Sequence, residues 1–249
     1  MARSVALIVM ILFAGAVSGQ DKPADVVKKA IAAHGGEAVL KRFPAATSKI
    51  AGEILTDPKI PFTGTTAYSM PGKVRVEMEF TVDTRKATTA QIINGDKVSQ
   101  TENGKPSKLT PAMIEELRES AFIQEMSLLY PLIEGKKYEL EAGTDATFDG
   151  KECATVVVSA KGLKPTTLAF DKKTGLLTAM KRKGLAPGDN GLEKPRIVEE
   201  VTTFSDYEKV SGIMVPMQSR VTHDGKDFLK IKVLEYKPLT KLDGDFMVD

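Results

Sequence analysis

Residues 110–133 read TPAMIEELRESAFIQEMSLLYPLI, the one long helical pattern in the middle of a chain that otherwise reads as strands. Thr110 is a good N-cap, and Pro111 suits the first helical position, where its missing N–H costs nothing. Pro131 is expected to end or kink the helix. Large apolar residues form two neighbouring stripes: Ile114, Leu117, Ala121 and Leu128 on one, and Phe122, Met126, Leu129 and Ile133 on the other.

The segments on both sides of this helix alternate with a period of two. The clearest is KVRVEMEF at residues 73–80, where apolar side chains face one way and charged ones the other. Roughly eleven strands with short turns predict one continuous antiparallel sheet, which must curl because flat twisted sheets rarely exceed about ten strands. We therefore expect the sheet to curve around the helix. The other expected strands lie at residues 48–55, 63–70, 86–94, near 98, 136–142, 152–160, 166–171, 176–183, 196–207, 214–223 and 227–237.

A second helical pattern, PADVVKKAIAAHGGEAVL, covers residues 23–40. His34-Gly35-Gly36 interrupts it, since Gly35 suits a left-handed cap and a histidine in the last turn interacts well with the helix dipole. We interpret His34 as a capping residue rather than a catalytic base.

The first 19 residues differ from the rest. Arg3 gives a positive start, an apolar segment follows, and AGAVSG supplies small residues for a signal peptidase. The sequence predicts a signal peptide at residues 1–19, a single domain at residues 20–249 and export of the protein, with an uncleaved anchor as the alternative. Cys153 is the only cysteine, so no internal disulfide is expected, and we interpret it as buried filler.

Charge and motifs exclude several classes of protein. The net charge is +2, with 35 basic and 33 acidic residues interspersed, so nothing indicates a nucleic-acid partner. His34 and His223 lie in opposite halves, outside any metal-ligand spacing, and no cofactor motif occurs. The pairs Glu115-Glu116 and Glu199-Glu200 are expected to be solvated rather than catalytic. We predict no metal, no cofactor and no enzyme.

The remaining features are hydrophobic. Ten methionines are present, and this flexible side chain is common where a surface accepts varied apolar ligands. We predict an apolar cavity between sheet and helix. Ordinary core residues packed without a cavity remain the alternative. The predicted lining residues are Val74, Val76, Met78 and Phe80 of the sheet and Met113, Leu117, Phe122, Met126 and Leu129 of the helix.

Two late segments are similar to a known family. They read FDKKTGLLTAMKRK from Phe170 and FSDYEKVSGIMVPMQSRVTHDGKDFLKIKVLEYK from Phe204, and the chain ends DGDFMVD. Together with the early AAHGGEAVLKR, they resemble exported proteins of the LolA/LolB-like, lipoprotein-carrier fold. The resemblance implies an α+β fold, mainly antiparallel β: a curved, unclosed β-barrel with helices packed in its concave mouth. It also implies a buried arginine that latches a helical lid, for which Arg118 is the candidate.

The predicted function is that of a periplasmic carrier that binds a lipid or lipoprotein acyl chain in the apolar cavity. Its expected partners are those acyl chains, with envelope membrane proteins as candidates, and the protein is expected to be a monomer. The alternative is a non-catalytic structural or interaction module of the envelope with the same fold and a filled core.

Overall fold

The computed structural model describes residues 22–82, 85–133, 137–186 and 195–242, together with residues 244 and 246. The predicted signal peptide lies outside these residues. Four helices occur among them: α1 (Pro23–Ala33), α2 (Glu37–Arg42), α3 (Pro111–Ser127) and α4 (Tyr130–Ile133). In that part of the chain, no helix is long and apolar enough to cross a membrane.

The strands form one 14-stranded sheet in which every pairing is antiparallel. They are β1 (Ala45–Ile54), β2 (Ile60–Ser69), β3 (Lys73–Val82), β4 (Arg85–Asn94), β5 (Lys97–Glu102), β6 (Lys105–Pro106), β7 (Glu139–Ala142), β8 (Ala146–Phe148), β9 (Lys151–Ser159), β10 (Thr166–Asp171), β11 (Leu177–Ala186), β12 (Arg196–Val210), β13 (Ile213–His223) and β14 (Lys226–Leu239). The predicted curved, mainly antiparallel sheet is confirmed. The predicted count of about eleven was too low, partly because β6 and β8 have only 2 and 3 residues.

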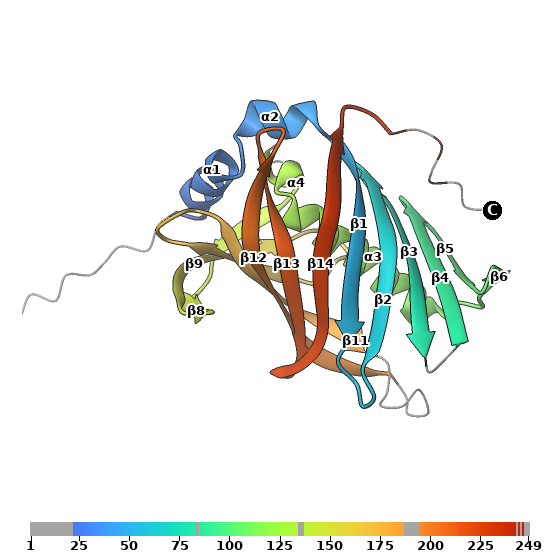
Figure 1. Cartoon of the computed structure of the whole chain (residues 1–249). Coiled ribbons are helices and arrows are strands. Elements are labelled where there is room, and N and C mark those ends of the chain that lie inside the picture. The colour runs from blue at the N-terminus through green and yellow to red at the C-terminus, as the bar shows by residue number, and fades with distance from the viewer. Residues whose placement is uncertain are drawn as a thin grey trace, which may run out of the picture.

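The strand order places the two ends of the chain's β-structure side by side. It runs β6-β5-β4-β3-β2-β1-β14-β13-β12-β11-β10-β9-β7, with β8 also paired to β9. The last strand, β14, therefore pairs with the first, β1, in the middle of the sheet. β6 and β7 end the order without pairing with each other, so the barrel stays open (Figure 1).

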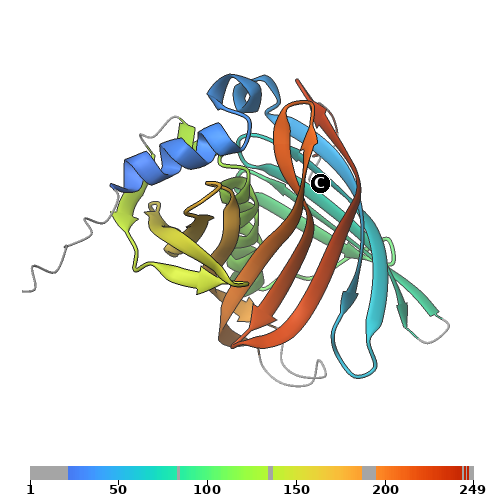
Figure 2. The same cartoon turned by 60° about the vertical axis from the view of Figure 1, so that its left-hand side comes forward.

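Helix α3 lies inside the curve of the sheet, and α1 lies across its open side (Figure 2). The helix begins as predicted, because the Thr110 hydroxyl accepts a hydrogen bond from Met113 N at 3.3 Å and Pro111 opens the first turn. It ends at Ser127, earlier than the expected break at Pro131. Leu129 turns the chain with a φ of +57°, and Pro131 lies within the short helix α4.

Helix α3 is wedged between two hydrophobic cores. Phe122, Met126 and Leu129 belong to the main core, which α1 and strands β9–β11 complete. Ala121 belongs to a second core with Tyr68 and residues of β1, β3 and β4. The helix thus buries two faces rather than one, which agrees with its two apolar stripes.

His34 is confirmed as a helix cap, and it also joins α1 to the sheet. Its Nδ1–H donates to Ala30 O at 2.8 Å, and its Nε2 accepts from Leu177 N at 3.4 Å. Its own carbonyl accepts from Met214 N at 3.1 Å. These bonds require the neutral ring, and burial lowers the pKa of His34 below its ordinary value of 6.5, despite the opposing hydrogen bond to Ala30.

This neutral histidine predicts a pH effect on stability. Below about pH 6.5, His34 binds a proton in the unfolded chain but stays neutral in the folded protein. The free energy of unfolding should therefore decrease as the pH is lowered through that range. Urea unfolding at about pH 7.5 and about pH 5 measures this loss, which should be smaller in His34→Gln, where nothing titrates at that position. Equal losses in the two proteins would contradict the assignment.

Candidate functional site

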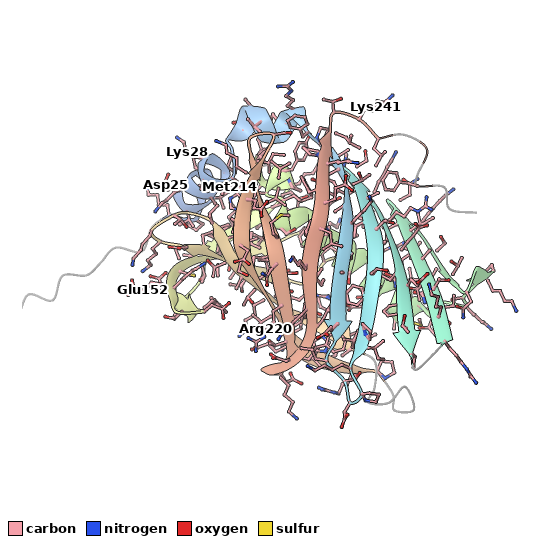
Figure 3. The ribbon with its side chains drawn as sticks, viewed as in Figure 1. Asp25, Lys28, Glu152, Met214, Arg220 and Lys241 are labelled. Carbon is pink, nitrogen blue, oxygen red and sulfur yellow. The ribbon has the colours of Figure 1, made fainter. Side chains whose placement is uncertain are left out.

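The inner face of the sheet, which faces α3, is defined by strand alternation and register. Val74 packs with Ala121 of α3 in the second core, so Val76, Met78 and Phe80, at alternate positions of the same strand, also face inward. Pairing extends this face to the neighbouring strands, where Met78 lies beside Gly64. The outer face carries charged residues, among them Arg220 of β13 (Figure 3). Arg220 forms an ion pair with Asp227.

The nine predicted lining residues divide into two groups. Phe122, Met126, Leu129 and Val74 are at most 7% exposed and belong to the two cores, and Val76 packs against the second one. The structure places Met78, Phe80, Met113 and Leu117 differently, because they are half-buried and belong to no hydrophobic cluster of the described residues.

Further half-buried apolar residues lie beside Met78 and Phe80. We name this set the inner apolar strip, and it comprises Ile54, Met78, Phe80, Leu229, Ile231 and Val233. The predicted lining did not include the three β14 residues Leu229, Ile231 and Val233. Their alternation with lysines in the sequence could have indicated them. No described cluster includes any of the six, so they present apolar surface on the same side of the sheet as α3.

Two inward-facing glycines shape the floor between these residues. A Cβ at Gly52 would meet Lys230 O at 2.1 Å and the Phe62 ring at 2.5 Å. A Cβ at Gly64 would meet Glu77 O at 2.3 Å. Only glycine permits these close approaches, which allow the strands to curve while the Phe62 ring lies over Gly52.

A buried charge cluster joins α3 to the opposite wall. Arg182 of β11 is 9% exposed. Its guanidinium lies 2.7 Å from Glu116 and 3.8 Å from Glu119, both of α3, and 2.8 Å from Glu200 of β12. Glu116 also accepts from Leu185 N at 2.8 Å. The N-terminal half of α3 is therefore held against β11 and β12 by charge.

Two further side chains complete this Arg182 cluster. Lys164 lies 2.9 Å from Glu119, and His223 Nε2 lies 3.3 Å from Glu200. Burial alone would raise the pKa of Glu200, but the hydrogen bond to His223 and the charge of Arg182 hold that pKa below its ordinary value. The carboxylate thus stays ionised beside the arginine at neutral pH.

The cluster overturns two predictions. Glu116 and Glu200 are not solvated, since their side chains are only 15% and 18% exposed. The physical reason is that neighbouring residues point to different faces, so Glu199 pairs with Lys181 while Glu200 turns inward. Arg118 is not the buried arginine, because its side chain is 41% exposed beside Asp96.

The opposite end of α3 is held by another carboxylate. Glu125 accepts a hydrogen bond from Gly72 N, in the turn between β2 and β3. Burial raises the pKa of Glu125, although the Gly72 bond and the charge of Lys137 oppose the change. Helix α3 is therefore attached by charged side chains to both walls of the open barrel.

The described cavities differ in size and chemistry. One of about 40 Å³ lies beside the end of α3, between Leu40, Leu128 and Tyr236. One of about 820 Å³ lies between α1 and the β7–β10 region, where Asp145 pairs with Lys172 at 2.5 Å. One of about 570 Å³ follows β1–β5, and outer-face polar residues form much of its lining. Within the described ranges, no three His, Cys, Asp or Glu residues are grouped to hold a metal.

Comparisons with known proteins identify the fold. No protein-family model and no curated protein matches the sequence. A LolA superfamily protein from Nitrosomonas europaea is similar in structure, with a TM-score of 0.58 and 9% identity over 92% of this chain and 98% of that one. A DUF1329 family protein from Desulfovibrio piger gives 0.55 and 14%, over 90% and 96% of the chains.

A third solved structure is a putative outer membrane lipoprotein-sorting protein domain from Vibrio parahaemolyticus. Its TM-score is 0.51 with 9% identity, over 89% of this chain and 94% of that one. The chain thus has a LolA/LolB-like fold, as the sequence resemblance implied. At these identities, the similarity defines the fold alone.

Proposed function

We propose that this protein is a periplasmic carrier that binds a lipid or lipoprotein acyl chain on the inner face of its open barrel. The observation that carries the proposal is the inner apolar strip, a half-buried apolar surface on the same side of the sheet as α3. Each acyl CH₂ buried there would contribute about 0.8 kcal/mol, so a modest contact suffices for binding. One of the structural neighbours bears a lipoprotein-sorting name, which agrees with this role.

The Arg182 cluster supplies a latch for this carrier. Met113 and Leu117 lie on the α3 segment that Glu116 attaches to Arg182. Separating that pair would free this segment from β11 and widen access to the inner apolar strip. Arg182 thus takes the place that the family resemblance gives to a lid-latching arginine. The role requires no catalytic group, and we propose a non-enzymatic monomer.

A filled envelope module is the second candidate. Its supporting observation is the tight packing of Phe122, Met126 and Leu129 in the main core. Val156, Val158 and Leu168 of that core are also fully buried. The two candidates differ in what they predict for Met113, which belongs to none of the described clusters.

Direct lipid analysis tests the proposal. Protein purified without detergent should carry lipid that mass spectrometry detects after mild extraction, and delipidated protein should take up a fluorescent fatty acid. Met113→Asp should weaken uptake at least about tenfold, because a charge would enter the half-buried part of α3 that is predicted to line the ligand site. Ala112→Asp is the matched control. Ala112 is the neighbour of Met113 in the first turn of α3, but its side chain is exposed.

The result divides the two candidates. Lipid-free protein that takes up no fatty acid would favour the filled module. Equal uptake by the two folded variants would show that this part of α3 does not contact the ligand. Circular dichroism establishes that each variant is folded.

A further inference from the structure

Two tyrosines meet on the inner face, above strand β1. Tyr68 comes from β2 and Tyr236 from β14, and their hydroxyl oxygens are 2.5 Å apart. Register places Tyr68 beside Ala46 and Tyr236 beside Ser48, both of β1. The small Ala46 side chain leaves room for the two rings to reach across the strand.

This tyrosine pair has one hydrogen-bond donor left over. Two hydroxyls carry two protons, and the bond between them uses one. Among the described residues, the bond between the two hydroxyls is the one hydrogen bond recorded for either of them. Burial raises the pKa of Tyr68 and of Tyr236, so both stay protonated at neutral pH. The hydroxyl pair is half-buried, and a bound acceptor would give the spare donor a partner shielded from water.

The space beside the pair fits a small acceptor. Both tyrosines line the cavity of about 40 Å³, together with apolar residues such as Leu40, Phe43 and Leu128. That volume is close to the share of one water molecule, about 30 Å³. No lysine or arginine is among the residues described around it. An uncharged oxygen, such as a carbonyl, suits this cavity better than a phosphate.

A polar row separates the tyrosine pair from the inner apolar strip. Ser48 Oγ lies 2.7 Å from Thr66 Oγ1, and register places Ser48 between Thr66 and Tyr236 on the inner face. Four residues further along β1, about 13 Å at about 3.3 Å per residue, Gly52 lies in the row of Phe80 and Ile231. The inner face therefore passes from hydroxyls to hydrocarbon over the length of a medium acyl chain.

We propose that the ligand is an acyl chain headed by a carbonyl group, and that the Tyr68–Tyr236 pair donates the hydrogen bond that its carbonyl oxygen accepts. The chain then runs past Ser48 and Thr66 and lies on the inner apolar strip. This inference rests on the proposed carrier function and adds the chemistry and orientation of the ligand. An ester and a free carboxylic acid share the required oxygen.

Three pyrene-labelled probes of equal length test it: a methyl ester, a free acid and an alkane. Wild-type protein should bind the ester and the acid about three- to tenfold more tightly than the alkane, as expected for one hydrogen bond. The double variant Tyr68→Phe/Tyr236→Phe should remove that preference and leave alkane binding unchanged, whereas a single variant still has one hydroxyl free to donate. Tighter binding of the ester than of the acid would identify an esterified acyl chain as the ligand. Tighter binding of the acid would identify a free fatty acid.

Tyr207→Phe is the matched control. It also removes a buried hydroxyl, which donates to Leu177 O at 2.6 Å, but away from the tyrosine pair. This variant should lose stability and keep the carbonyl preference. With a ¹³C-labelled ester, the infrared carbonyl band should move to higher frequency in the double variant Tyr68→Phe/Tyr236→Phe and stay unchanged in Tyr207→Phe.

The outcomes separate the inference from the function beneath it. If the wild type binds no probe, both the carrier function and the ligand orientation are wrong. If it binds all three probes equally, or if the carbonyl preference survives in the double variant of Tyr68 and Tyr236, the carrier function stands and the tyrosine pair is not the head-group site.

Discussion

Replacing Arg182 with alanine is expected to lower the free energy of unfolding by about 3–5 kcal/mol. The arginine is the charge partner of Glu116, Glu119 and Glu200, at distances from 2.7 to 3.8 Å. Removing it leaves three carboxylates at a buried position, with Lys164 near only one of them. Urea unfolding followed by circular dichroism measures the change.

Arg118→Ala is the control for this prediction. Arg118 lies on α3 and pairs with Asp96, but both side chains are exposed, so its loss should cost at most about 1 kcal/mol. The Arg182→Ala deficit should also shrink toward about pH 5, because burial raises the pKa of Glu200 and the charge of Arg182 would no longer oppose that rise. A deficit that is small at neutral pH, or independent of pH, would show that the cluster does not hold α3.

Met126→Ala is expected to destabilise the protein by about 2–5 kcal/mol, the range for removing a large side chain from a packed core. Met126 is fully buried in the main core, between α1, α3 and strands β9–β11. The lost contacts and the remaining cavity both contribute. Thermal or urea unfolding measures the effect.

Met113→Ala provides the contrast, on the same helix and with the same change of side chain. Met113 is half-buried and lies outside the described clusters, so its truncation should cost about 1 kcal/mol or less. Lipid uptake should follow the opposite order, with a larger loss in Met113→Ala. Equal destabilisation by the two variants would indicate that the N-terminal half of α3 is packed as tightly as the rest.

Local patterns account for much of the fold. The capping residues of α3, the interruption at His34 and the alternation of residues 73–80 each depend on neighbours in sequence, and all were predicted. The short strands β6 and β8 carry too few residues to alternate and were missed. The end of α3 was placed too late, because Pro131 is an obvious breaker and Leu129 gives no sign of its positive φ.

The charge cluster could not be predicted in the same way. Arg182 stands between Lys181 and Lys183, so the sequence resembles the polar end of a strand. In the structure, side chains alternate between the two faces, and of these three only Arg182 points inward. Its partners on α3 lie more than 60 residues away in the sequence. Only the tertiary structure shows that an inward arginine meets inward glutamates, and a single sequence contains no periodicity that reports this.

The pairing of β14 with β1 has a consequence for how the chain is made. One long side of β1 receives its hydrogen-bonding neighbour only from residues 226–239, close to the C-terminus. During synthesis, strands β1–β6 are therefore made long before β14, the strand that covers this edge of β1. Because an uncovered edge invites pairing with other chains, the nascent polypeptide passes through an aggregation-prone interval that lasts until β14 has been made.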